Sequence, residues 1–300
     1  MHKTAYPLLL LTTLFWGGNA VAGKLAVGHI SPMLLTTARW GFALVLLCLI
    51  GWSRLASDWP TVQRNALYLI VLGAFGFTAF NVALYSAVVY TSAINVSIEQ
   101  AAIPMLIFLA NFLLFRLRAT WAQIVGFVVS IAGVALTACH GDPARLLALD
   151  LNFGDVLMLV AVAAYAGYTV ALRFKPDIHW QTLMIAMTAG AFITSLPFAV
   201  AELATGAAIP PDARGWSVVV YTTIFPSILA QLFFVKGVEL IGANRAGLFV
   251  NLVPVFGTLM SVLLLGEDFY LYHAVALMLV LGGIWLAETS GRRAAADSAR

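Results

Sequence analysis

The stretch "GANRAGLFVNLVPVFGTLMSVLLLGE", residues 242–267, decides the fold. It is apolar enough to cross a bilayer, yet it contains Asn244, Arg245 and Asn251, and a proline, Pro254, near its middle. A proline inside a membrane helix removes a backbone hydrogen bond and tends to kink the helix. Neighbouring helices or a cavity must then satisfy the freed carbonyl group. The stretch therefore predicts a bent membrane helix that borders a polar space.

The composition of the whole chain is typical of a membrane protein. Of its 300 residues, 62% are hydrophobic and 10% are charged, whereas about 25% of the residues of an ordinary soluble domain are charged. Apolar runs recur along the chain, and each is long enough to cross a hydrocarbon core about 30 Å thick. The polar stretches between them are predicted to be loops, residues 53–65 among them. We predict ten membrane spans, at residues 5–28, 32–52, 66–89, 93–115, 120–140, 154–173, 179–202, 216–238, 243–265 and 270–289.

The positions of lysine and arginine predict how the chain is oriented. With ten spans and the N-terminus inside, twelve basic residues fall on the cytoplasmic side, and only Lys24, Arg145 and Arg214 fall on the other. Loops on the cytoplasmic side of a membrane carry an excess of lysine and arginine. We therefore expect a multi-pass protein of the inner or plasma membrane with both termini in the cytoplasm.

An internal repeat appears when the chain is aligned with itself at an offset of 150 residues. Residues 92–136 then lie on residues 242–286 without a gap. The matched positions are Pro104 with Pro254, Gly133 with Gly283, and, upstream, Asn81 with Gln231.

The repeat divides the chain into two units, residues 1–150 and 151–300, with five predicted spans each. Because five is an odd number, the two units must enter the membrane from opposite sides. Inverted repeats of this kind are typical of secondary transporters, whose substrate site lies near the bilayer midplane between the repeats. We therefore predict an all-α membrane protein with two inverted five-helix repeats around a central cavity.

Several motifs in order resemble one transporter family over essentially the whole chain. They are "LFWGGNAVAGK" at 14–24, "SPMLLTTARWG" at 31–41, the opening stretch, and "LVLGGIWLAE" at 279–288. This set is similar to the drug/metabolite transporter superfamily, in its ten-span EamA-type branch, and resembles the aromatic amino-acid exporters there. The resemblance implies a cavity lined by helices 1, 3, 4, 6, 8 and 9, and ATP-independent export of small metabolites, most often amino acids. One departure is "LFRLR" at 114–118, where the second repeat has "LLGED".

Polar residues inside the predicted spans are the first candidates for substrate binding. Glu99 and Gln100 lie one turn before Pro104, and an ionisable group inside a membrane is expensive, at about 2.5–3.5 kcal/mol or more. Glu99 is therefore a candidate for binding a substrate amino group or a proton; the alternative is a structural ion pair. Asn81 and Gln231 suit a polar ligand or an interhelical hydrogen bond.

Aromatic side chains and the prolines complete the set of candidates. Rings that line a pocket favour a flat or apolar cargo, although each ring considered alone could equally belong to the core. Pro104 and Pro254 are predicted to kink the fourth helix of each repeat and to serve in gating. The remaining predicted binding residues are Trp16, Asn19, Phe80, Tyr85, Tyr165, Tyr168, Phe249 and Asn251.

Other charged residues are predicted to be structural. Arg39 and Lys24 could pair with Glu202 or extend their charged ends to an interface. Glu267 and Asp268 are expected to form a solvated loop cap. The five histidines fall near span ends and not on one helix face. The chain has no catalytic, nucleotide-binding or clustered metal-binding motif, so we predict no enzyme activity, no cofactor and no metal.

These features predict a secondary transporter that exports small metabolites by alternating access. Amino acids are favoured as cargo, particularly aromatic or large neutral ones. The alternative cargo is a lipophilic cationic drug, for which Glu99 would exchange protons. We expect the lipid bilayer and a small-molecule substrate as partners, no nucleic acid, and a functional monomer.

Overall fold

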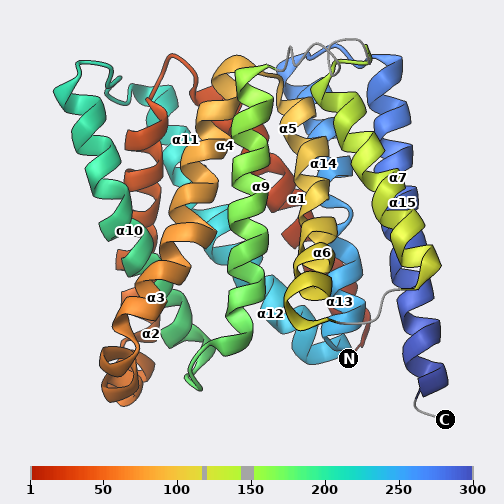
Figure 1. Ribbon diagram of the computed structural model, residues 1–300. Helices are drawn as coiled ribbons and strands as arrows, with labels where there is room; N and C mark the ends of the chain where they lie inside the picture. The colour runs from red at the N-terminus through yellow and green to blue at the C-terminus, as the bar shows by residue number, and fades with distance from the viewer. Residues whose placement is uncertain (1, 117–119, 143–151, 299–300) are drawn as a thin grey trace.

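The computed structural model describes residues 2–116, 120–142 and 152–298, and all regular secondary structure within them is helical. Nine helical spans of the described chain are long and apolar enough to cross a membrane, and Leu271–Ala287 is a shorter apolar helix. These ten segments correspond to the ten predicted spans. The prediction of an all-α, ten-span membrane protein is therefore confirmed (Figure 1).

In the first half the first, second and fifth spans are continuous helices. Its third and fourth spans are each broken into several helical pieces. The elements are α1 (His2–Ala26), α2 (Pro32–Arg64), α3 (Ala66–Gly73), the π-helix η1 (Ala74–Ala79), α4 (Phe80–Tyr90), α5 (Ala93–Glu99), the 3₁₀-helix η2 (Gln100–Ala102), α6 (Ile103–Phe115) and α7 (Trp121–Ala138).

The second half repeats this order with the corresponding interruptions. Its last helix continues past the predicted end at residue 289. The elements are α9 (Phe153–Ala171), the 3₁₀-helix η3 (Leu172–Phe174), α10 (Trp180–Ala204), α11 (Ala213–Ile224), the π-helix η4 (Phe225–Leu229), α12 (Ala230–Ile241), α13 (Ala243–Val250), α14 (Val253–Met260), the π-helix η5 (Ser261–Leu265) and α15 (Leu271–Ser298).

The two halves run in opposite directions and pack against each other in matching pairs. α1 begins on the face that carries the chain termini, whereas α9 begins on the opposite face (Figure 1). Helix α7 packs along α15, α2 packs along α10, and the contact of α1 with α12 is matched by that of α9 with α4. Helices in equivalent positions of the two halves therefore meet, as expected for inverted repeats.

The helix interruptions fall at matching positions 150 residues apart. The 3₁₀ turn Gln100–Ala102 precedes Pro104, and a turn at Asn251 and Leu252 precedes Pro254. Each proline lies in the first turn of the next helix, where its missing N–H costs least. The π-helices η1 and η4 are the second matched pair. Single-turn π segments are frequent at functional sites.

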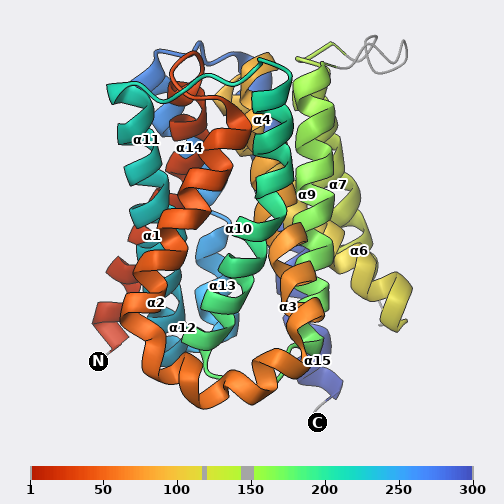
Figure 2. The same cartoon turned by 90° about the vertical axis from the view of Figure 1, so that its left-hand side faces the viewer.

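Residues 53–65 are not the predicted loop, and this expectation was wrong. Helix α2 continues without a break to Arg64 and turns sideways along the face that carries the termini (Figure 2). Leu55 and Val62 of this part are buried while most of its residues are exposed. Its polar composition reflects an amphipathic helix at the membrane surface, and hydropathy cannot separate such a helix from a loop.

Small residues let several helices approach closely. Gly126 of α7 faces Gly283 of α15, and Gly17 of α1 faces the backbone of Gly257 in α14. Ser130 adds a hydrogen bond of 3.1 Å from its hydroxyl to the Val280 carbonyl. Such small-residue contacts are the usual means of helix association in membranes.

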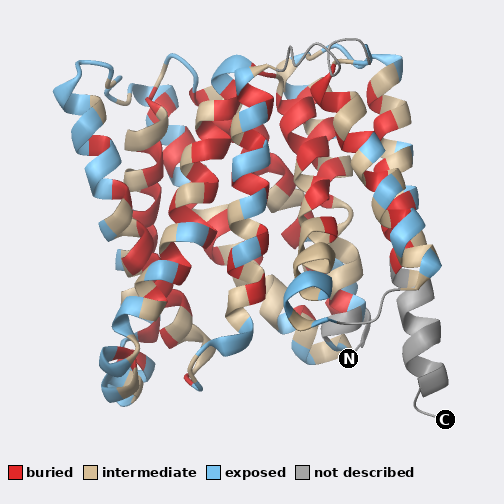
Figure 3. Cartoon of the chain, in the orientation of Figure 1, coloured by how far each residue is buried: buried red, intermediate tan, exposed pale blue. Residues whose placement is uncertain are grey.

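Burial is uneven along the membrane normal. All seven residues of α5 are buried, whereas Met105 is the only buried residue of α6. In α13 and α12 the buried residues described are Ala246, Ala230 and Gly237. Buried residues accordingly concentrate on the side away from the termini (Figure 3). The helices are packed tightly on that side and loosely on the terminal side.

Candidate functional site

A buried arginine, Arg39 of α2, lies at the centre of a polar network between the two halves. Its side chain is 4% exposed. The guanidinium donates to the Asn19 and Asn81 side-chain oxygens at 2.8 and 2.7 Å, to the Ser227 hydroxyl at 2.7 Å, and to the Tyr85 hydroxyl. Tyr85 in turn donates to Asn19 at 2.9 Å. Four helical elements, α1, α2, α4 and η4, thus meet at one cation.

All hydrogen-bond partners of Arg39 are neutral. The ion pairs found among the described residues do not include it, and its Nη2 atom makes none of the hydrogen bonds found in that part of the chain. Leaving a charge buried without a counter-charge costs several kcal/mol in a typical protein interior, about 3–5 where one partner of a buried pair has been removed. A chain that keeps such a cation has an unused capacity to bind an anion.

The expectation that Arg39 or Lys24 pairs with Glu202 was wrong. Glu202 of α10 accepts from the Ser31 hydroxyl at 2.5 Å and from the Leu34 N–H at 3.2 Å. It therefore caps the first turn of α2, where a negative charge is favourable. Lys24 donates to the Val88 and Thr91 carbonyl groups at 2.8 Å each, at the C-terminal end of α4.

A series of aromatic rings extends from Arg39 across the interface. The guanidinium carbon lies 4.7 Å from the Trp40 ring centre, a distance typical of a cation–π contact. Trp40 stacks on Phe77 at 4.6 Å, and Phe77 lies 5.8 Å from Tyr168. Tyr165 joins Tyr168 to Phe80, with ring centres 5.3 and 5.0 Å apart. We call six aromatic residues the aromatic ladder. Five of them follow one another in the order Trp40, Phe77, Tyr168, Tyr165 and Phe80, and the sixth, Tyr85, lies beside Arg39.

The π-helix η4 explains how Ser227 reaches Arg39. Pro226 has no N–H and so cannot continue the regular α-helical pattern. The Thr222 carbonyl, which loses its usual donor at Pro226, accepts from the Ser227 hydroxyl at 2.8 Å, and the Pro226 carbonyl accepts from the Trp16 indole at 3.2 Å. The interruption thus turns backbone groups of the second half toward residues of the first.

An open groove of about 490 Å³ lies beside Tyr168, the middle ring of the aromatic ladder. It runs between α3–η1 of the first half and α9 of the second, and its walls are almost wholly apolar. Tyr168 is one of its walls, together with Leu72, Phe75, Val160 and Gly167. The volume falls in the range of about 300–1,000 Å³ that is typical of small-ligand pockets. Phe75 and Val160 are more than half exposed, so the groove opens toward the lipid.

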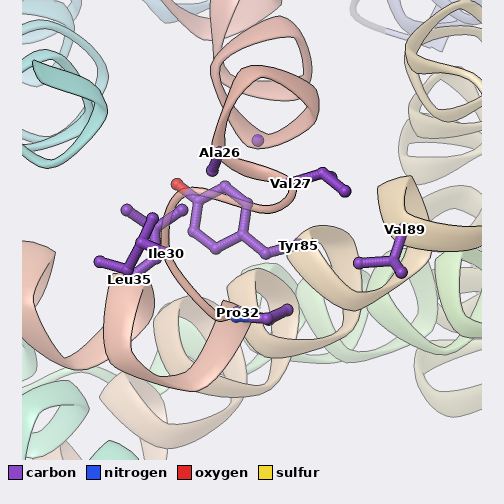
Figure 4. A pocket seen from close by; sticks show the side chains of 8 residues that line it. Ala26, Val27, Ile30, Pro32, Leu35, Tyr85 and Val89 are labelled. Atoms are coloured by element: carbon purple, nitrogen blue, oxygen red, sulfur yellow. The ribbon is translucent and has the colours of Figure 1, made fainter. Parts of the chain in front are cut away.

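The opposite end of the Arg39 network is closed. A pocket of about 10 Å³ lies beyond Tyr85, enough space for about one water molecule, and apolar side chains line it (Figure 4). Ala26, Ile30 and Leu35 surround the Tyr85 ring there, and Tyr85 itself is 1% exposed. On this side the network is sealed from the membrane face that lies away from the termini.

Charged side chains tie together the loops of the same face. Glu267 accepts from the Ala93 and Ile94 N–H groups at 2.8 and 2.9 Å; the expectation of a purely solvated cap was wrong for this residue, although Asp268 is exposed. Asp212 accepts from the Gly215 N–H and contacts His29 at 2.7 Å, and these hydrogen bonds lower the pKa of Asp212.

Replacing Glu267 by Gln is expected to destabilise the closed face. The carboxylate satisfies two free N–H groups at the start of α5, and losing a helix cap typically costs about 0.5–2 kcal/mol. We expect a lower midpoint in thermal unfolding of the purified protein. Asp268→Asn is the matched control because this neighbouring acid is exposed. Equal midpoints for the two variants would contradict the assignment of Glu267 as the cap of α5.

Two acidic side chains are buried on the closed side of the described chain. Glu99, at the end of α5, is 0% exposed, and Asp155, in the first turn of α9, is 1% exposed. Neither Glu99 oxygen has a hydrogen bond within the described chain, whereas Thr91 and Asn95 lie beside the Asp155 carboxylate. The adjacent Gln100 donates to the Val96 carbonyl of its own helix at 3.3 Å. Sequence reasoning singled out Glu99 and Gln100 but missed Asp155, which stood at a predicted span end.

The other predicted site residues lie apart from Arg39. Its hydrogen bonds do not reach Gln231, Phe249 or Asn251. The ring of Phe249 lies 6.0 Å from that of Tyr6, near the N-terminus, and the Asn251 N–H donates to the Leu248 carbonyl at 3.3 Å. The ring of Trp16 lies 5.4 Å from that of Phe234, tilted by 49°.

Two members of the network were not predicted as binding residues. The sequence shows Arg39 as a charged residue inside a predicted span. No acidic residue stands three or four positions away to pair with it, and this could have identified it as a binding residue. Ser227 has no such signal, because only the π-helix brings it to Arg39. Asn19, Asn81 and Tyr85 were predicted, and the structure places all three around the same cation.

Comparison with known proteins agrees with this architecture. The EamA-like transporter family matches the chain twice, at residues 3–139 and 152–289. Similar proteins include the uncharacterized transporter YetK of Bacillus subtilis (strain 168), 26% identical over 94% of this chain and 86% of that protein. The uncharacterized inner membrane transporter YicL of Salmonella typhimurium is 23% identical over 96% of both chains.

The fold is also found among solved structures. One crystal structure of a protein superposes with a TM-score of 0.64 at 20% identity, covering 97% of this chain and 98% of that one. The repeated family match, the multi-pass helical fold and the transporter relatives agree with one another. The chain belongs to the EamA-like transporter family and is a multi-pass membrane transporter of that family.

Proposed function

We propose that this transporter is a secondary carrier that exports carboxylate-bearing metabolites by alternating access, with aromatic and large neutral amino acids as its favoured cargo. The observation that carries the proposal is Arg39, a buried cation whose partners are all neutral. An amino acid supplies the missing carboxylate. A carrier of this kind needs no catalytic residue or cofactor, and we infer that the protein is not an enzyme.

The chemistry of Arg39 suits a carboxylate. A guanidinium is planar and presents its N–H groups as a fork that matches two carboxylate oxygens. Its Nη1 atom faces three acceptors, Asn19, Asn81 and Tyr85, with only two hydrogens to donate. Substrate oxygens can replace some of these neutral acceptors, and the charge pair that forms offsets the cost of burying the cation.

The aromatic ladder supports the preference for large neutral side chains. Aromatic pairs in offset or edge-to-face geometry contribute about 0.5–1.5 kcal/mol beyond their buried area. From the Arg39 cation the ladder leads through Trp40 and Phe77 to Tyr168, which lines the apolar groove. A ligand with a carboxylate at one end and an apolar body matches this order of groups.

Alternating access is supported by the uneven burial of the chain. The face away from the termini is closed by Tyr85 with its apolar neighbours and by the contact of Glu267 with the start of α5. The helices on the terminal face are loosely packed. We propose that the termini lie in the cytoplasm, so that this conformation faces the cytoplasm and is ready to load an export substrate. Residues 1–150 and 151–300 would rock against each other as the two moving units of a functional monomer.

Counterflow in proteoliposomes tests the proposal. Vesicles are loaded in turn with unlabelled aromatic, aliphatic and charged amino acids, and the entry of labelled tryptophan is followed. We expect internal aromatic or large neutral amino acids to stimulate entry well above the level in empty vesicles. Absence of stimulation by any amino acid, in protein shown to be folded, would contradict amino acids as the cargo.

A second cargo class, lipophilic cationic drugs, is supported by Glu99 and the groove. Glu99 is a fully buried carboxylate without a hydrogen bond, and the groove is apolar and open to lipid. A carboxylate in this setting can exchange a cation for a proton. This version predicts that Glu99→Gln abolishes resistance of cells to such cations; unchanged resistance would exclude it.

A further inference from the structure

Two histidines that are far apart in the sequence meet around Asn95 on the closed side. The Tyr270 N–H donates to His273 Nδ1 at 3.1 Å, so the proton of the neutral His273 ring lies on Nε2. Nε2 is 3.1 Å from the Asn95 side-chain oxygen, and the Asn95 amide lies 3.4 Å from His140 Nε2. Donors and acceptors therefore alternate in one direction from His273 to His140.

The chain of polar groups continues from His140 to a buried acid. With Nε2 as an acceptor, the neutral His140 ring carries its proton on Nδ1, which lies 3.9 Å from Asp155 Oδ2. The His140 side chain is 31% exposed, whereas that of Asp155 is 1% exposed. His140 is therefore the residue through which this series of polar groups reaches solvent on the face away from the termini.

Glu99 lies at the inner end of the same cluster. Glu99 ends α5, which packs against α9, the helix that carries Asp155, and the two carboxylates repel each other. Thr91 and Asn95 lie beside Asp155. Both Glu99 oxygens are buried without a hydrogen bond in the described chain. Two like charges in such a site cannot both persist without a large cost. Asp155 lies in the first turn of α9, where the helix dipole stabilises a negative charge. Glu99 lies at the C-terminal end of α5, where the dipole does not stabilise a negative charge.

Among the described residues, no lysine or arginine pairs with Glu99. Helices α6 and α14 and the π-helix η5 carry no titratable residue, and the Lys24 ammonium is held by the Val88 and Thr91 carbonyl groups. Glu267 is bound to the start of α5. The described residues also contain no group of three or more His, Cys, Asp and Glu suited to a metal ion. The titratable groups around the pair are Lys24 of α1, Cys139 and His140 after α7, Tyr272 and His273 of α15, and Glu267 after η5.

We propose that Glu99 and Asp155 form a proton-binding site, in which Glu99 holds the proton and His140 passes protons between Asp155 and the face away from the termini. Asn95 and His273 are positioning residues that fix the ring orientation and tautomer of His140. The site joins α5 of the first half to α9 of the second, so its protonation acts on the contact that must change in alternating access. The inference depends on the geometry of this cluster and not on which solute is carried.

Infrared spectroscopy of the full-length protein in lipid tests the site without any transport assay. At neutral pH ordinary carboxyl groups are ionised, so a carboxylic acid C=O band at that pH reports a retained proton. We expect this band in the wild type and its loss in Glu99→Gln. Glu239→Gln is the control, because Glu239 is exposed and pairs with Lys236 at 2.9 Å. Absence of the band in the wild type, or its persistence in Glu99→Gln, would overturn the site.

Two further measurements distinguish proton binding by Glu99 from a purely structural role of this residue. Because the folded protein holds a proton that the unfolded chain releases at neutral pH, thermal stability of the wild type should fall as pH rises, and Glu99→Gln should weaken this dependence. His140→Gln should keep the band and slow its response to a pH jump severalfold. A response as fast as that of the wild type would overturn the role of His140.

Discussion

Replacing Arg39 by Gln is expected to lower amino-acid counterflow about 100-fold or more. Losing one member of a buried, hydrogen-bonded charge pair typically costs about 3–5 kcal/mol, and about 1.4 kcal/mol corresponds to a factor of ten in affinity. Gln can still hydrogen-bond to Asn19, Asn81 or Ser227, so the polar network is not left empty. The measurement is the initial rate of labelled tryptophan entry into preloaded proteoliposomes.

Two variants make the Arg39 prediction specific. Arg173→Gln is the matched control, because Arg173 is exposed and contacts Asn111 at 3.0 Å outside the network. Arg39→Lys keeps the charge but loses the planar fork, so we expect partial activity with weakened affinity. A folded Arg39→Gln protein that carries amino acids at the wild-type rate would contradict carboxylate binding at this residue.

Replacing Gly283 by Ala is expected to destabilise the packing of α7 against α15. A Cβ atom at this position would lie 2.8 Å from the Ser130 backbone nitrogen and closer still to the Gly126 carbonyl. Helices α7 and α15 would have to separate, and overfilling a packed interior typically costs about 1–3 kcal/mol. Thermal unfolding in detergent should show a clearly lower midpoint than that of the wild type.

The adjacent glycine provides the control for this prediction. A Cβ atom on Gly282 would meet no other atom within 4 Å, and Ala forms helices better than Gly by up to about 1 kcal/mol. Gly282→Ala should therefore keep or raise the unfolding midpoint. Similar losses in both variants would show that close packing of α7 on α15 is not the cause.

Much of the architecture could be predicted from the sequence because it depends on local patterns. Long apolar runs gave the spans, and matched prolines such as Pro104 and Pro254 marked the helix interruptions. Residues 53–65 were misassigned because an amphipathic surface helix has the composition of a loop. The predicted order of the membrane spans did not depend on that segment.

The site was harder to predict because its contacts join distant parts of the chain. Asn19, Asn81 and Tyr85 were identified by type, but only the fold brings them to Arg39. The histidines near span ends gave no common helix face, yet His140 and His273 meet through Asn95. Interhelical hydrogen bonds of this kind leave no periodic signal in one sequence.

The most direct test of carboxylate recognition compares analogues of one amino acid. Vesicles preloaded with tryptophan, with tryptamine, which lacks the carboxylate, or with indole-3-propionate, which lacks the amino group, are tested for entry of labelled tryptophan. If Arg39 binds the carboxylate, tryptophan and indole-3-propionate should stimulate entry and tryptamine should not. Stimulation by tryptamine equal to that by tryptophan, with none by indole-3-propionate, would contradict the account and favour a cationic cargo.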